Sequence, residues 1–143
     1  MSSTGAMALI LAGGLTMVAA IAHLACLVVG AAAFRLMGAG ERTAQAVEAG
    51  HLQPMIVTAG IAAMLITWAA YAFAAAGLID SLPFEKVVLP AIGAVFLARA
   101  FGFPWLMLAF PGNSKTFWRV SSGICLGIGS LYALGTAAVW AHL

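Results

Sequence analysis

Charged residues are scarce in this chain of 143 residues, which contains six Lys or Arg and four Asp or Glu, or 7% of the total. A water-soluble domain carries about a quarter charged residues. The deficit therefore excludes a soluble globular domain, a disordered chain and a nucleic-acid-binding protein. With 64% hydrophobic residues, the composition predicts an all-α integral membrane protein that forms a single domain, residues 1–143, in the lipid bilayer.

Motifs that supply familiar chemistry are also missing. The sequence has no G-x-x-x-x-G-K-[ST] loop, no G-x-G-x-x-G fingerprint, no C-x-x-C pair, no H-E-x-x-H and no G-x-S-x-G. Nucleotide-driven transport, dithiol redox chemistry and common hydrolase mechanisms therefore lack their residues. We predict no catalytic residue of these kinds and no cofactor.

Long uncharged runs define the predicted spans. A hydrocarbon core of about 30 Å needs about 20 helical residues. Three runs without Asp, Glu, Lys or Arg meet this length, and a fourth is interrupted only by Arg99. The sequence thus predicts a four-helix transmembrane bundle with short connections and spans at about 7–34, 52–79, 87–110 and 120–142.

The connections contain turn and cap signals. Gly38-Ala-Gly40 precedes Glu41–Glu48, which we interpret as a short interfacial helix or an extension of the second span. Pro54 is expected in the first turn of the second span or at a kink. Asn113 or Ser114 is expected to cap the helix that leads into the fourth span.

Lys and Arg are concentrated in the first and third connections, which contain Arg35, Arg42, Lys115 and Arg119. The other segments outside the spans contain only Lys86. The positive-inside rule then predicts both termini on the non-cytoplasmic side, in what we interpret as a bacterial inner (plasma) membrane. The first apolar run lacks a basic segment before it and exceeds the length of a signal-peptide core. We therefore expect it to be retained as a span.

Polar and aromatic side chains are predicted to meet in one layer of the bilayer. Arg99 lies twelve residues before Pro111 and His23 twelve residues before Arg35, so both are expected roughly 18 Å from the cytoplasmic ends of their helices. Counting along the second and fourth spans adds further groups to this layer. The candidate ligand-binding residues are Arg99, His23, Thr67, Trp68, Tyr71 and Tyr132.

Arg99 is the most informative of these residues. A guanidinium near the bilayer centre costs about 2.5–3.5 kcal/mol on insertion scales, and no Asp or Glu lies inside a span. Three kinds of partner remain open: hydroxyls, rings and carbonyls of other helices, a carboxylate such as Glu48 folded inward, or an anion or subunit from outside the chain. Pro90 and Pro104 can bend this span and free carbonyls to line a cavity.

His23 and Cys26 share a helix face, and Cys125 is expected at a similar depth. This set is a weak zinc or copper signal, and we predict no metal site. The alternatives for His23 are a hydrogen bond within the bundle, a proton relay, or contact with the molecule that Arg99 binds.

Gly123 and Gly127 form a G-x-x-x-G in the fourth span, which predicts close helix packing within the bundle, with a second copy or with another membrane protein.

Three functions stay open at this point. The first is an accessory or assembly subunit of a larger membrane complex. The second is a binder or carrier of an amphiphilic anionic molecule or lipid around Arg99. The third is an isomerase-type membrane enzyme that uses His23 as acid or base and Arg99 to stabilise an anion.

Overall fold

The computed structural model describes residues 1–143 and is all-helical, with no strand. Three helices are long and apolar enough to cross a membrane, namely α1, α4 and α7 together with η1, and α5 with α6 makes a fourth only if this bent pair is one span. The fold is therefore compatible with that of an integral membrane protein. The helices are α1 (Ser3–Val29), α2 (Ala31–Leu36), α3 (Glu41–Glu48), α4 (Gln53–Ala75), α5 (Glu85–Phe101), α6 (Phe103–Ala109), α7 (Lys115–Val139) and the 3₁₀ helix η1 (Trp140–His142).

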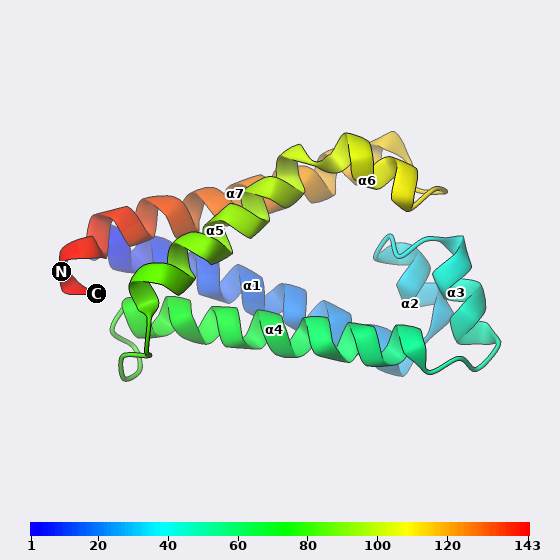
Figure 1. Cartoon of the computed structure of the whole chain (residues 1–143), viewed down its shortest axis with the longest axis horizontal. Coiled ribbons are helices and arrows are strands. Elements are labelled where there is room, and N and C mark those ends of the chain that lie inside the picture. Colours follow the sequence, from blue (N-terminus) through cyan, green and yellow to red (C-terminus); the bar gives the residue numbers. More distant parts are fainter.

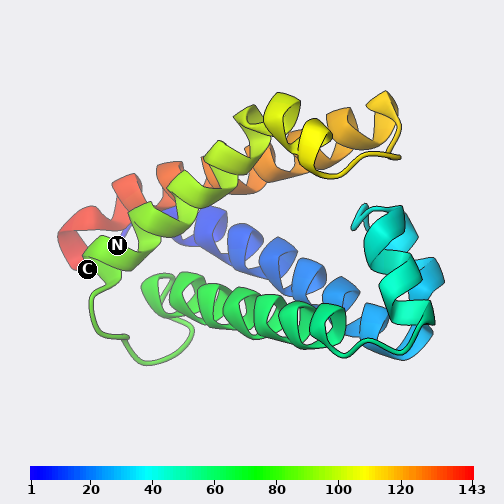
Figure 2. The same ribbon diagram turned by 45° about the vertical axis from the view of Figure 1, so that its right-hand side comes forward.

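The long helices form two pairs that converge at one end. α1 packs along α4, α5 packs along α7, and α1 also contacts α7. Figure 1 shows both termini at the end where the pairs meet, and α2 and α3 at the opposite end. The rotated view in Figure 2 shows the same divergence of α1–α4 from α5–α7. We call the end with the termini and residues 76–84 the closed end, and the end with α2, α3 and α6 the open end.

The predicted third span is not one straight helix. α5 and α6 meet at Gly102 with a bend of 70°. Pro104 lacks an N–H and its ring would crowd the carbonyl of residue 100 in a continuous helix, so the break falls just before it. A Cβ at position 102 would lie 2.7 Å from the carbonyl oxygen of Ala98, and only glycine fits this bend. The helix therefore breaks after Arg99, next to Pro104, whereas Pro90 lies within the continuous helix α5.

The first span also ends earlier than predicted, because α1 runs from Ser3 to Val29 and not to residue 34. Gly30 adopts φ 87°, a left-handed conformation that glycine tolerates and other residues resist. The chain then forms α2, a turn and α3, which is separate from α4. Glu41–Glu48 is therefore a short helix of its own and not an extension of the second span, which ends at Ala75.

An ion-pair cluster joins α2 to α3. Arg35 donates to Glu41 at 2.9 and 2.7 Å and to Glu48 at 2.8 Å. The hydrogen bonds from Arg35 hold the pKa of Glu41 below its ordinary value, and those to Glu41 and Glu48 raise the pKa of Arg35. We call Arg35, Glu41 and Glu48 the clip, since they join the two short helices.

Helix starts follow the local sequence signals. Phe117 N donates to Ser114 Oγ at 3.0 Å, so Ser114 is the residue that caps α7. Pro54 lies in the first turn of α4, where a missing N–H costs nothing.

Candidate functional site

Four helices meet at a buried aromatic layer between the closed end and the open end. Tyr132 on α7 is fully buried, and its hydroxyl donates to the carbonyl of Trp68 on α4 at 3.1 Å. The same hydroxyl lies 3.2 Å from Thr16 Oγ1 on α1. Phe96 on α5 stacks on Tyr132 and meets the Trp68 ring edge-to-face, with centroids 5.8 and 5.6 Å apart. We call Thr16, Trp68, Phe96 and Tyr132 the central layer.

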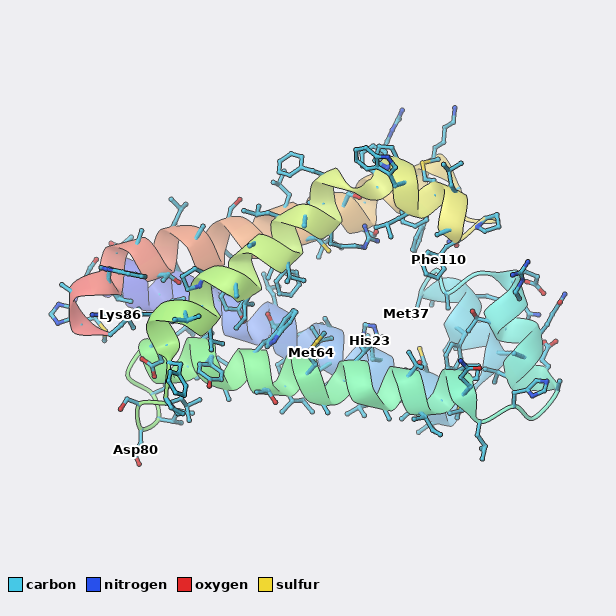
Figure 3. The ribbon with its side chains drawn as sticks, viewed as in Figure 1. His23, Met37, Met64, Asp80, Lys86 and Phe110 are labelled. Carbon is cyan, nitrogen blue, oxygen red and sulfur yellow. The ribbon has the colours of Figure 1, made fainter.

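A partly open cavity of about 600 Å³ lies on the open-end side of the molecule, between the two helix pairs and α2–α3. More than half of its lining residues are hydrophobic. Its polar lining includes His23, Arg42 and Arg99, and no Asp or Glu contributes to it. Figure 3 shows His23 pointing from α1 into the space between the helix pairs. The cavity therefore combines apolar walls with positive charge that no lining carboxylate neutralises.

Arg99 lies in the last turn of α5, where the negative end of the helix dipole favours a cation. Its Nη2 donates to Ser121 Oγ at 2.8 Å and its Nη1 to Ser122 Oγ at 3.5 Å, both on α7. The guanidinium also lies over the Trp118 ring, 5.2 Å from the centroid. Of the partners left open by the sequence, hydroxyls and a ring are the ones present, and Glu48 pairs with Arg35 instead.

The bend at Gly102 changes the depth expected for Arg99. Counting twelve residues from Pro111 assumed one straight helix, but α6 turns by 70° away from α5. Arg99 is only two residues from the end of α5, and Ser121 is in the second turn of α7. The side chain therefore lies near one end of two long helices and not at their midpoints.

His23 has one ring nitrogen occupied within α1. Its Nδ1 lies 2.7 Å from the carbonyl oxygen of Ala19, and because a carbonyl only accepts, Nδ1 carries the proton in this contact. Nε2 is left for a partner in the cavity. Cys26 also lines the cavity, but its thiol donates to Ala22 and Cys125 is not in the lining. No group of three or more His, Cys, Asp or Glu side chains is placed to hold a metal ion.

The two tips at the open end touch through a small contact set. Asn113 Nδ2 donates to the carbonyl of Gly38 at 3.0 Å. The Phe117 ring covers Gly38 so closely that a Cβ there would overlap it. We call Gly38, Asn113 and Phe117 the latch. Figure 3 shows Met37 and Phe110 at the same two tips, and both line the cavity.

The structure does not bring the six candidate site residues together in one place. Arg99 and His23 line the cavity, and Trp68 and Tyr132 belong to the central layer. Thr67 is exposed and bonds back to Ala63 in its own helix. Tyr71 donates to the carbonyl of Pro83 near the closed end.

Several residues near the cavity were not predicted as site residues from the sequence. Arg42 was assigned only a topological role, yet it lines the cavity. Ser121 and Ser122 were not singled out, although consecutive serines near the end of a span are a signal of polar contact. Trp118, which also lines the cavity, is buried beneath the Arg99 guanidinium.

No protein-family model, curated protein or solved structure shows significant similarity to this chain.

Proposed function

We propose that the protein binds an amphiphilic anion, with its polar head against Arg99 and its apolar part against the cavity wall. The supporting observation is the cavity of about 600 Å³, whose lining contains two arginines and a histidine but no carboxylate. A volume of this size suits a drug-sized or single-chain lipid-like ligand. Arg99 uses two of its N–H groups on serines, and a guanidinium has further donors for an anion.

Charge distribution supports an orientation for this site. Arg35, Arg42, Lys115 and Arg119 all lie at the open end, and Lys86 lies near the closed end. By the positive-inside rule the open end faces the cytoplasm and both termini face the opposite side of a bacterial inner membrane. On this orientation the ligand head lies near the cytoplasmic boundary. A reporter that is active only in the cytoplasm should be inactive when fused to the C-terminus. Activity of this fusion would contradict the orientation.

Native mass spectrometry of protein extracted in mild detergent tests the binding function. The wild type should carry an additional mass from a co-purified amphiphile, and Arg99→Gln should lose it. Arg119→Gln is the matched control, because it removes one arginine from an exposed position outside the cavity. A wild-type spectrum of unliganded protein alone, or equal loading of Arg99→Gln and wild type, would count against the proposal.

A second candidate function is that of an accessory subunit that docks through α7. A Cβ at Gly123 or Gly127 would meet nothing within 4 Å, whereas Gly129 and Gly135 pack tightly against Leu97 and Leu9. The G-x-x-x-G pair is thus free for a helix of another membrane protein.

Co-purification tests the subunit function. Gly127→Leu should remove a partner that co-purifies with the wild type. Gly60→Leu is the control, since Gly60 is an equally open glycine on α4. Isolation of the wild type as a homogeneous species without partner proteins would argue against this function.

A further inference from the structure

We propose that the ligand head is a phosphate monoester, held between Arg99 of α5 and Arg42 of α3. This inference rests on the proposed binding function and specifies the chemical class of its ligand. A lipid phosphate and a simple alkyl phosphate share this chemistry. The decisive feature is a second cation on the cavity wall that has no partner within the chain.

Arg42 is left without a partner because its neighbour uses the nearby carboxylates. Arg35 occupies both Glu41 and Glu48 with hydrogen bonds of 2.7–2.9 Å. Arg42 takes part in no ion pair and donates no hydrogen bond to the rest of the chain, although it lines the cavity. Two arginines in one short segment thus have different roles, since Arg35 joins α2 to α3 and Arg42 remains available.

The latch connects the segment that carries Arg42 to the region around Arg99. Gly38, four residues before Arg42, lies beneath the Phe117 ring. The Phe117 ring meets the ring of Trp118 edge-to-face at 5.5 Å, and Trp118 lies beneath the Arg99 guanidinium. This series of contacts connects α2–α3 to the end of α5. Both cations line the one cavity.

Charge and geometry favour a phosphate over a carboxylate. A phosphate monoester carries about −1.5 to −2 charge at pH 7, which matches two guanidinium groups, whereas a carboxylate would leave one of them unneutralised. The planar guanidinium also suits paired hydrogen bonds to phosphate oxygens. Val57 and Ile61 of α4 and Leu106 of α6 line the same cavity, and they provide apolar surface for the attached chain.

Three probes with the same apolar chain test this assignment: dodecyl phosphate, methyl dodecyl phosphate and dodecanoate. Binding is measured by titration of the purified full-length protein in mild detergent or lipid nanodiscs. The wild type should bind dodecyl phosphate about tenfold or more tightly than either monoanionic probe, because the second arginine adds a charge-assisted hydrogen bond.

The variants separate this inference from the broader binding function. Arg42→Gln should abolish the preference for dodecyl phosphate and leave dodecanoate affinity nearly unchanged, Arg99→Gln should weaken all three probes, and Arg119→Gln should behave like the wild type. Equal affinity of the wild type for dodecyl phosphate and dodecanoate, or Arg42→Gln with the preference intact, overturns the phosphate assignment alone. Failure of all three probes to bind the wild type overturns both the assignment and the binding function.

Discussion

The closed and open ends differ in the side chains that lie between the helices. At the closed end, glycine lets the backbones approach closely: a Cβ at Gly135 would lie 2.7 Å from Leu9 Cγ and 3.2 Å from the carbonyl oxygen of Gly5. At the open end, bulky residues such as Phe110 and Trp118 line a cavity, and the latch makes the contact between the tips.

This difference shows how one helical domain combines a rigid region with a binding space. In lipid, helices associate through close packing and hydrogen bonds because hydrocarbon tails compete equally for apolar side chains. Small residues therefore determine where the helices approach, and aromatic residues keep them apart elsewhere. The central layer, with Tyr132 bonded to α4 and close to Thr16 of α1, marks the boundary between the two regions.

Gly135→Leu should have the largest effect, because it forces the closed end apart. The new side chain meets both Leu9 and the backbone of Gly5, and overpacking of this kind costs about 1–3 kcal/mol or more. The unfolding temperature in mild detergent should fall clearly. Gly123→Leu, on the open face of the same helix, should leave it nearly unchanged. Equal losses from the two variants would show that the closed end is not tightly packed.

Gly38→Ala should open the latch. Gly38 has φ 76°, where a Cβ costs about 1–2 kcal/mol, and the methyl group would also overlap the Phe117 ring. Spin-label distances between Gln45 on α3 and Ala109 on α6 should lengthen and broaden. Gly50 has a similar positive φ, but a Cβ there would meet nothing within 4 Å. Gly50→Ala is therefore the control that introduces backbone strain without an overlap. If both variants retain the wild-type distance, the latch does not hold the tips together.

Sequence patterns predicted the all-helical membrane fold because hydropathy and length directly limit which segments can cross a bilayer. They placed α4 and α7 within a few residues and placed Trp68 and Tyr132 together. The position of the bend was not predicted, because the sequence offered a break at either Pro90 or Pro104, and the structure bends at Gly102, next to Pro104. Of the candidate site residues, His23 and Arg99 line the cavity, but a pattern of helical faces does not reveal that Arg42 of α3 lines it too.

Tyr132→Phe should have a smaller effect, confined to the central layer. It removes the hydroxyl that donates to the carbonyl of Trp68 and contacts Thr16, while the ring stack with Phe96 remains. Loss of one buried hydrogen bond should lower the free energy of unfolding by about 0.5–1.5 kcal/mol. Tyr71→Phe, which removes a hydroxyl bound to Pro83 near the closed end, should cost less. An equal or greater loss for Tyr71→Phe would contradict the central role of Tyr132.

Acidification should produce the smallest and most local effect, at the clip. Arg35 holds the pKa of Glu41 below its ordinary value, so the clip contributes fully above the ordinary carboxyl pKa of about 4.3. That contribution is lost as the pH falls through the lower value in the folded protein, because the protonated carboxyl no longer pairs with Arg35. Spin-label distances between Ala32 on α2 and Ala49 after α3 should stay constant from pH 7 down to about 4.3 and broaden as the pH falls further. Glu41→Gln should be broadened already at pH 7 and change less on acidification.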